Sequence, residues 1–252
     1  LTLRKTALKS CMDEILWIYQ RKSNNIHDLK PHVWDEWADE DGSIGKAYGY
    51  QIGQRYVHHN MTSESILELQ KEYPSAELGI NPNNWTGRYV SLDQIDAVIY
   101  DLKHNPYSRR IMTNIYNFED LHEMNLYPCA YSMTFNVTNE NGKLTLNAIL
   151  NQRSQDILAA NNWNVCQYAI LVMMLAQVCD MVPGELLHVI SDCHIYDRHV
   201  DVIKELITRP QYPAPKVYLN PEVKDFYAFT TDDLIVEDYV AGPQVKNIPI
   251  AV

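Results

Sequence analysis

Residues 151–164 read NQRSQDILAANNWN and link a predicted pair of strands to a predicted apolar helix. Arg153 and Ser154 set a guanidinium beside a hydroxyl, a pairing suited to phosphate oxygens. Asp156 follows closely, and the carboxamide of Asn164 both donates and accepts hydrogen bonds, so it can match an imide edge such as that of uracil. We therefore expect this stretch to bind a phosphorylated nucleotide.

The segments on either side of this stretch predict a mixture of strands and helices. Residues 132–137 and 143–150 resemble strands around Asn141-Gly142, a dipeptide typical of hairpin turns. Residues 163–179 are apolar on nearly every side, which predicts a central buried helix ended by Pro183-Gly184. Further strands are expected at 111–116 and 186–195, and a further helix at 197–208. The pattern indicates an α+β fold with a mostly antiparallel or mixed sheet.

The first hundred residues add helices and a polar segment. Residues 1–20 have apolar side chains at helical spacing, with Glu14 near the edge of the apolar stripe. A second helix is predicted to begin at Ser91 as N-cap, with Gln94 in the capping-box position, and to end near Asn105-Pro106. Residues 54–90 are polar, with a short helix at 62–73 and turns at 81–84, and we expect them to form a surface insertion.

Length and composition limit the possible classes of protein. The 252 residues, with 46% hydrophobic and 21% charged side chains, fit one globular domain spanning residues 1–252. A net charge of −11 argues against a nucleic-acid or membrane surface, which would need a basic face. Five cysteines without a CxxC spacing favour a reducing compartment, so we expect a cytoplasmic protein.

Two further groups of residues suggest chemistry. Cys129 follows Pro128, and a nearby arginine would lower its thiol pKa and favour a thiolate nucleophile, although a buried cysteine often serves only in packing. The segment containing Asp192, His194, Tyr196 and His199 could suggest a metal site. Strand alternation instead places His194 and Tyr196 on one face, where they suit sugar hydroxyls, so no metal is expected.

These residues together resemble the thymidylate synthases and their phage nucleotide-hydroxymethylase relatives. The resemblance covers nearly the whole chain except 54–90. It is carried by ordered pieces: Glu14-Ile15-Leu16-Trp17, Trp34-Asp35-Glu36-Trp37-Ala38, Tyr48-Gly49, Ser108-Arg109-Arg110, Pro128-Cys129, Gln152-Arg153-Ser154 with Asp156, Asn164, Asp192-x-His194-x-Tyr196 and Ala251-Val252. The resemblance implies an obligate homodimer with sheets packed face to face. It also implies a reaction between deoxyuridine monophosphate (dUMP) and 5,10-methylenetetrahydrofolate.

The resemblance also implies roles for the residues around the nucleotide. Cys129 would add to carbon 6 of uracil, which makes carbon 5 nucleophilic, and Asn164 would read the imide edge. The remaining nucleotide contacts would come from Arg153 and Ser154 on the phosphate, Arg109 and Arg110 contributed by the partner subunit, and His194 and Tyr196 on the ribose hydroxyl.

Other residues would serve the folate and the proton transfers. Glu14 and Tyr48 would assist proton transfers at carbons 4 and 5 through water, and Trp34 would pack beside the folate and the methylene intermediate. Asp156 would hold the pterin and help order the base, and the terminal Ala251-Val252 would close over the folate.

The sequence departs from the family pattern at several points. Ala130 stands where a histidine is usual, and the usual Gly and Pro-Phe before Asn164 are replaced by Ala160-Asn161-Asn162-Trp163. The two amides could admit water to the methylene intermediate, so a deoxyuridylate hydroxymethylase is the alternative to a methyl-forming enzyme. An intact Ala251-Val252 end favours methyl formation.

Two further expectations concern the front of the chain and activity itself. The family has an earlier segment with a phosphate-binding arginine, and the sequence begins after it, so we expect a fragment that binds nucleotide weakly. A catalytically silent binding homologue is a remote alternative. The joint presence of Glu14, Cys129, Arg153 and Asn164 argues against it.

Overall fold

A mixed four-stranded sheet forms the centre of the computed structural model, which describes residues 1–55, 57–61, 63–74, 76–80, 88–246 and 248. Its strand order is β4-β5-β6-β7, with antiparallel pairing from β4 to β6 and parallel pairing of β6 with β7. The four strands are β4 (Met112–Asn114), β5 (Ala130–Glu140), β6 (Lys143–Asp156) and β7 (Val182–His194). The predicted α+β class and mixed sheet are confirmed.

The turn between β5 and β6 is the predicted hairpin. Asn141 and Gly142 have φ angles of 55° and 85°, the left-handed conformation that these two residue types tolerate best. The resulting register pairs Met133 with Leu150 and Ala130 with Gln152. The long hairpin therefore brings residues just before β5 beside the residues of β6 that the sequence marks as a phosphate site.

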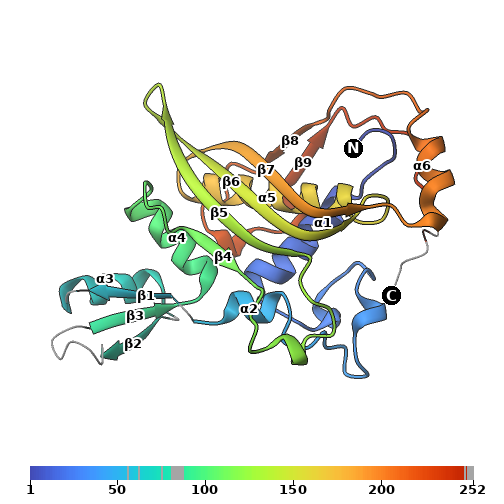
Figure 1. The fold of residues 1–252 in the computed structure, drawn as a ribbon. Helices are drawn as coiled ribbons and strands as arrows, with labels where there is room; N and C mark the ends of the chain where they lie inside the picture. The colour runs from blue at the N-terminus through green and yellow to red at the C-terminus, as the bar shows by residue number, and fades with distance from the viewer. Residues whose placement is uncertain (56, 62, 75, 81–87, 247, 249–252) are drawn as a thin grey trace.

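Helices α5 (Asn161–Val178) and α1 (Leu8–Ile15) form the layer behind the sheet (Figure 1). Leu171, Leu175 and Ala176 of α5 have no exposed surface, so this helix is buried as predicted. A π-helical turn (Leu16–Gln20) continues α1. Two predicted site residues lie on these helices: Glu14 near the C-terminal end of α1 and Asn164 near the N-terminal end of α5.

The N-terminal helix begins later than predicted. Residues before it pair with the C-terminal segment, since Lys5 N–H donates to Gly242 O at 3.1 Å and Gly242 N–H donates to Thr2 O at 2.9 Å. Thr6 N–H also donates to the Tyr239 hydroxyl at 2.8 Å. These long-range bonds compete with helical ones, so α1 starts only at Leu8.

The end of α5 also differs from the prediction. Asp180 has φ 53°, and Met181 N–H donates back to Ala176 O at 2.8 Å, the pattern of a Schellman C-cap. Pro183 and Gly184, predicted to end the helix, instead lie inside β7. Helix α5 ends because of this cap.

Residues 54–92 contain a second, smaller sheet that the sequence analysis missed. Its order is β1-β3-β2, from β1 (Val57–Met61), β2 (Glu77–Ile80) and β3 (Arg88–Leu92), and it stands to one side of the main sheet (Figure 1). The predicted helix is α3 (Ser63–Glu72), whereas the predicted turn at 81–84 lies outside the described residues. A small hydrophobic cluster including Ile66, Leu69 and Val90 supports this sheet.

Helix α4 (Gln94–His104) begins at a different cap from the one predicted. Its N-cap is Asp93, whose carboxylate accepts from Asp96 N–H at 3.0 Å. Ser91 belongs to β3, and its hydroxyl donates to Arg55 O at 3.0 Å. Aspartate caps as well as serine does, and pairing of β3 with its neighbours extends past Ser91.

The remaining elements are short. The C-terminal part has α6 (Val200–Leu206) and a hairpin of β8 (Lys216–Leu219) with β9 (Leu234–Glu237). Short helical turns are η2 (Ile26–Asp28), η3 (Asp35–Trp37), α2 (Gly49–Gly53), η4 (Leu121–Glu123), η5 (Asp197–His199), η6 (Phe226–Ala228) and η7 (Thr231–Asp233). Among the described residues, no helix combines the length and apolarity needed to span a bilayer.

Candidate active site

Cys129 and Arg153 are brought together by the β5–β6 hairpin. Arg153 N–H donates to Cys129 O at 2.9 Å, and the guanidinium donates to the carbonyls of Pro128 (Nε, 3.0 Å) and Tyr127 (Nη2, 2.8 Å). Arg153 Nη2 lies 3.9 Å from the Cys129 sulfur. The predicted partnership of thiol and arginine is therefore present, with the arginine fixed by backbone carbonyls.

The electrostatics of Cys129 differ from the expectation. Burial raises the pKa of the thiol above its ordinary value, and the charge of Arg153 only partly offsets that rise. The expected lowering by a nearby arginine is present, but burial outweighs it, because a half-buried sulfur loses hydration that one cation does not fully replace. Burial thus favours the protonated thiol, and the charge of Arg153 favours the thiolate.

Glu14 is deeply buried, with 5% of its surface exposed, rather than at the edge of the helix. Trp34 Nε1–H donates to Glu14 Oε1 at 3.0 Å, and Trp163 Nε1–H donates to Oε2 at 2.7 Å. Burial raises the pKa of Glu14, whereas the indole hydrogen bonds act in the opposite direction. A carboxyl whose pKa is raised in this way takes up a proton more readily than one in water.

Tyr48 contacts both the backbone of Cys129 and the ring of Trp34. Its hydroxyl accepts the backbone N–H of Cys129 at 3.2 Å, and its ring meets Trp34 edge-on with centroids 4.7 Å apart. Burial raises the pKa of Tyr48 well above its ordinary value, and the neighbouring Cys129 adds to the rise. The phenol stays neutral and can donate or relay a proton.

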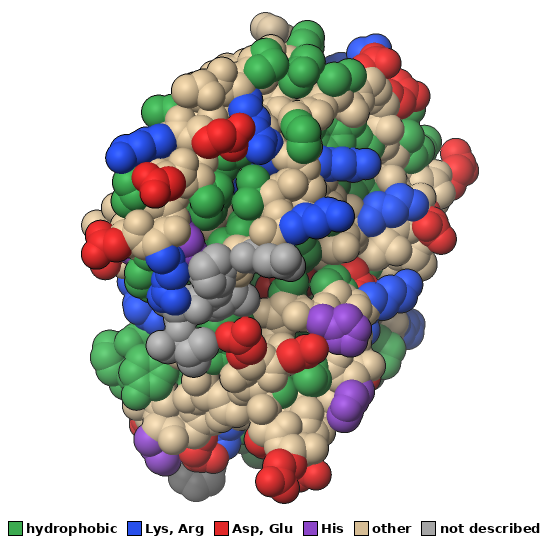
Figure 2. All heavy atoms as spheres, turned by 90° about the vertical axis from the view of Figure 1, so that its right-hand side faces the viewer, with side chains coloured by type: hydrophobic (Ala, Val, Ile, Leu, Met, Phe, Trp, Pro, Cys, Tyr) green, Lys and Arg blue, Asp and Glu red, His purple; other side chains and the backbone are tan. Residues whose placement is uncertain are grey.

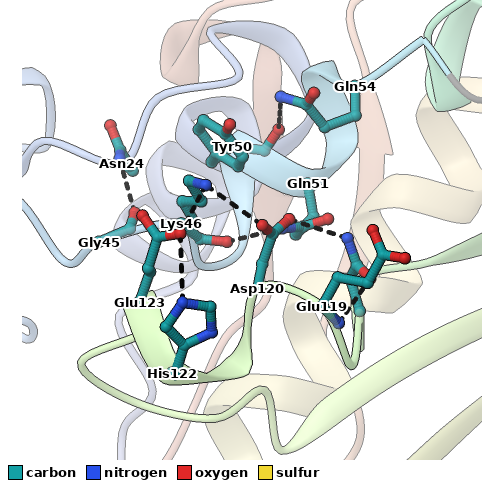
Figure 3. Close-up of polar contacts among 11 residues, drawn as sticks. Asn24, Gly45, Lys46, Tyr50, Gln51, Gln54, Glu119, Asp120, His122 and Glu123 are labelled. Carbon is teal, nitrogen blue, oxygen red and sulfur yellow. Dashed lines mark hydrogen bonds and ion pairs between the residues drawn. The ribbon is translucent and has the colours of Figure 1, made fainter.

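The turn that carries Tyr48 is held by a polar network (Figure 3). Lys46 binds Glu123 at 2.7 Å and Asp120 at 3.3 Å. Gln51 Nε2–H donates to Lys46 O at 2.9 Å and to Asp120 Oδ2 at 2.8 Å. Tyr48 itself has φ 46°, an uncommon value for a bulky residue. The network on both sides of the turn explains how this conformation is maintained.

Asn164 lies in the first turn of α5 among three glutamines. Its Oδ1 accepts from Gln152 Nε2 and Gln155 Nε2, each at 3.3 Å, and its Nδ2 donates to Gln167 Oε1 at 3.1 Å. Gln152 and Gln155 are each 1% exposed. The side chain predicted to read a base is thereby fixed in orientation, by partners that the sequence analysis did not single out.

The parallel pairing of β6 with β7 collects the remaining predicted polar residues. The register sets Ser154 beside Asp192 and Asp156 beside His194. The rings of His194 and Tyr196 meet edge-on with centroids 4.9 Å apart, as the alternation predicted. Ser154 and Asp156 lie at the C-terminal end of β6, which leads into α5 and Asn164.

Asp156 has a structural role in addition to its predicted one. Its Oδ1 accepts the backbone N–H groups of Leu158 and Ala159 at 2.9 and 3.0 Å, shaping the turn into α5. The fully buried His199 ring lies 3.6 Å from Oδ2. Sequence reasoning missed His199 as a partner because the two are 43 residues apart.

Some predicted residues stand apart from this cluster. Arg109 and Arg110 are exposed on the loop between α4 and β4, and neither forms an ion pair within the part of the chain that the structure describes. Ala251 and Val252 lie outside the described residues. Asn162 Nδ2 turns toward Thr6 Oγ1, 3.5 Å away.

The surface around the site is mixed in charge. Figure 2 shows both basic and acidic side chains on the face at the right of Figure 1, with several Lys and Arg side chains across its middle. Within the described ranges, no group of three or more His, Cys, Asp or Glu side chains could hold a metal ion. The chemistry available is that of a thiol, a buried carboxyl, a phenol and oriented amides.

The family model for thymidylate synthase matches residues 1–252. The chain belongs to the thymidylate synthase family. It is 40% identical to the thymidylate synthase of Bacillus licheniformis over 248 residues, which are 97% of this chain and 77% of that protein. Identity to thymidylate synthase 1 of Bacillus amyloliquefaciens is 38% over 254 residues, 99% of this chain and 96% of that protein.

The solved structures agree. Thermostable thymidylate synthase A from Bacillus subtilis matches with a TM-score of 0.78 and 38% identity, over 100% of this chain and 79% of that one. The thymidylate synthase fold is thereby confirmed. The chain is a one-carbon methyltransferase that acts on dUMP, forms dTMP and uses methylenetetrahydrofolate as cosubstrate.

Proposed function

We propose that Cys129 is the nucleophile of dTMP formation and adds to carbon 6 of dUMP. The observation that carries this proposal is the Cys129–Arg153 pair, with the sulfur 3.9 Å from a guanidinium nitrogen at the end of a rigid hairpin. Addition forms an S–C6 bond and leaves an electron pair at carbon 5, which attacks the methylene carbon. Loss of the carbon 5 proton then expels the folate amine nitrogen from that carbon and leaves an exocyclic methylene group. Hydride from the tetrahydrofolate reduces this methylene to methyl as the S–C6 bond breaks, which returns the thiolate and leaves dTMP and dihydrofolate.

The nucleotide is held by groups around this sulfur. Arg153 and Ser154 bind the phosphate, and Asn164 reads the uracil imide, because its carboxamide is fixed by three glutamines. His194 and Tyr196 bind the ribose hydroxyl. Their edge-on contact in the structure supports a joint role.

The proton transfers belong to Glu14 and Tyr48. Both are buried near one another, since Trp34 contacts each of them. Burial keeps Tyr48 neutral and raises the pKa of Glu14, which suits exchange of protons with carbons 4 and 5 through water.

The folate fits beside the aromatic cluster. The ring of Trp34 packs tilted against Trp17 and edge-on against Trp37, with centroids 5.8 and 5.7 Å apart, and this apolar cluster suits packing against a pterin. When bound, the cosubstrate supplies the one-carbon unit and the hydride. Asp156 offers a carboxylate to the pterin, and Ala251-Val252 close over it.

We also propose that the protein is a homodimer in which Arg109 and Arg110 complete the phosphate site of the other protomer. Exposed apolar side chains on β6 and β7 support pairing through the sheet, with Ile149 40%, Leu187 58% and Val189 42% exposed. Such a face is costly to leave in water. Five cysteines without a disulfide support a reducing, cytoplasmic location.

Trapping with 5-fluoro-dUMP and methylenetetrahydrofolate tests the nucleophile. The fluorine cannot be removed as a proton is, so the adduct accumulates and its mass is measured on the peptide containing Cys129. Cys129→Ser abolishes the adduct and retains nucleotide binding. An adduct that persists in Cys129→Ser would show that another residue attacks, and Cys193→Ser, which alters an exposed thiol, serves as the matched control.

Mixing two inactive variants tests the shared site. Cys129→Ser and Arg110→Glu protomers are each inactive alone as homodimers. A mixed dimer regains one complete site, because the protomer with Cys129 receives Arg110 from its partner. Failure to recover activity after confirmed subunit exchange would place Arg110 outside the partner's site.

A further inference from the structure

The two carboxylate oxygens of Glu14 accept hydrogen bonds from two tryptophans on different parts of the chain. Trp34, from the loop before η3, donates to Oε1, and Trp163, from α5, donates to Oε2 at 2.7 Å. A buried carboxylate costs free energy unless its oxygens are hydrogen-bonded. Each oxygen of Glu14 therefore accepts from a different indole.

Trp34 and Trp163 connect Glu14 to different parts of the structure. Trp34 belongs to the aromatic wall made with Trp17, Trp37 and Tyr48. Trp163 is half-buried in the first turn of α5 and immediately precedes Asn164. Its hydrogen bond thus joins Glu14 on α1 to the helical turn that carries the carboxamide expected to read the base.

The groups around Glu14 make the indole hydrogen bonds important for stabilising its charge. In the described part of the chain, the titratable groups that face it are Asp13 and Cys11 on its own helix, Tyr48, and Tyr168 on α5. None of these groups is a cation. Burial raises the pKa of Glu14, and hydrogen bonds from Trp34, Gln167 and Trp163 oppose that rise.

We propose that Trp163 is a positioning residue for the methyl transfer, whose indole N–H holds Glu14 in place relative to Asn164 and stabilises its ionised form. This inference rests on the proposed roles of Glu14 and Asn164. Trp163 follows Asn161 and Asn162, the two amides that could admit water to the methylene intermediate. In the structure, its indole reaches inward to Glu14 and the amide of Asn162 turns away toward Thr6.

The experiment removes only the indole N–H. Trp163→Phe keeps an aromatic ring, and 3-benzothienylalanine at position 163 keeps the full bicyclic shape with sulfur in place of N–H. The titration of Glu14 is followed by carbon NMR of protein carrying carboxyl-labelled glutamate, with Glu14→Gln identifying the signal. Trp37→Phe is the matched control, because Trp37 belongs to the same aromatic cluster but has no contact with Glu14 in the structure.

Both Trp163 replacements are expected to move the Glu14 midpoint upward by roughly one pH unit, because they remove a hydrogen bond to the charged form. Trp37→Phe is expected to leave the midpoint unchanged. The limb of the kcat/KM profile that reports Glu14 moves in parallel with the titration. An unshifted midpoint in both replacements, with the 5-fluoro-dUMP adduct still formed, would overturn the inference.

The contact between Trp163 and Glu14 is tested separately from the catalytic roles of Glu14 and Cys129. A shifted Glu14 titration with an unshifted kcat/KM profile supports the Trp163 contact and overturns the role of Glu14 in proton transfer. Loss of the 5-fluoro-dUMP adduct in the wild-type protein overturns the proposed nucleophile. The NMR midpoint still decides whether Trp163 binds Glu14, since that measurement needs no turnover.

Discussion

Arg153 Nη2 lies 3.9 Å from the sulfur of Cys129, and the same guanidinium is held by the carbonyls of Tyr127 and Pro128. Backbone carbonyls therefore hold the arginine beside the thiol. Its charge opposes the effect of burial on the thiol. This relationship gives the first prediction.

Replacing Arg153 with Gln is expected to slow alkylation of Cys129 at neutral pH. Burial already raises the pKa of this thiol, and loss of the cation raises it further, so a smaller fraction is thiolate at pH 7. The pH profile of iodoacetamide labelling, read by peptide mass, moves to higher pH. The exposed Cys193 in the same protein is the internal control, and an unmoved Cys129 profile would contradict the account.

Gly49→Ala is expected to damage both stability and turnover. A Cβ at this position would lie 2.1 Å from the backbone carbonyl oxygen of Ser23, so the turn carrying Tyr48 must shift. The free energy of unfolding in urea should fall by about 3 kcal/mol, a typical cost of forced overpacking.

Gly53→Ala, four residues later, is the control for this substitution. Its Cβ would meet only the Lys22 side chain, at 3.4 Å, which is an ordinary contact. Gly53→Ala should therefore remain near the wild type in both unfolding and kcat. Equal effects of the two substitutions would show that the Ser23 contact does not hold the Tyr48 turn.

Asp120 is expected to make stability depend on pH. Hydrogen bonds from Gln51 and then from Lys46 lower the pKa of Asp120 in the folded protein. Its contribution is present above the ordinary carboxyl pKa of about 3.9 and is lost as pH falls through the lower folded value. Asp120→Asn should thus lose less stability than wild type between pH 6 and pH 3.

The neighbouring Glu119 gives the control for Asp120. Glu119 is exposed, so Glu119→Gln should keep the wild-type dependence on pH. Urea unfolding at several pH values measures all three proteins. If the stability of Asp120→Asn fell with pH as steeply as that of the wild type, the acid sensitivity would belong to other carboxyls.

Asn164→Asp is expected to weaken dUMP binding by about tenfold or more relative to dCMP. An aspartate can still accept from Gln152 and Gln155, but it can donate neither to Gln167 nor to a uracil carbonyl. Binding of both nucleotides is measured by calorimetry. Asn162→Asp makes the same chemical change where the amide faces Thr6, and it should not alter the preference.

An unchanged preference in Asn164→Asp would remove Asn164 from base reading. A loss of binding to both nucleotides alike would instead indicate that the glutamine network had been disrupted.

The sequence predicted the parts of the site that local chemistry determines. Asn141-Gly142 specified the hairpin, and the hairpin register then brought Cys129 to Arg153. Helix α5 was readable because apolar residues cover nearly all its sides. These features depend on short-range rules that hold without knowledge of the rest of the fold.

The parts that were missed depend on distant partners. Residues before Leu8 look helical, but their backbone bonds go to a segment more than two hundred residues away. Pro183 and Gly184 suggest a helix end, yet they are accommodated in β7 because α5 has already been capped at Asp180. The hydrogen bond from Trp163 to Glu14 was missed, since nothing local reveals that this indole N–H reaches a residue of α1.

Product analysis tests the central claim most directly. The protein is incubated with dUMP and methylenetetrahydrofolate, and both the nucleotide and the folate products are identified by mass, with Cys129→Ser as the blank. The account predicts dTMP together with dihydrofolate, because a methyl group forms only when hydride reaches the methylene carbon. Hydroxymethyl-dUMP together with tetrahydrofolate would contradict it, since that pair shows that water captures the intermediate.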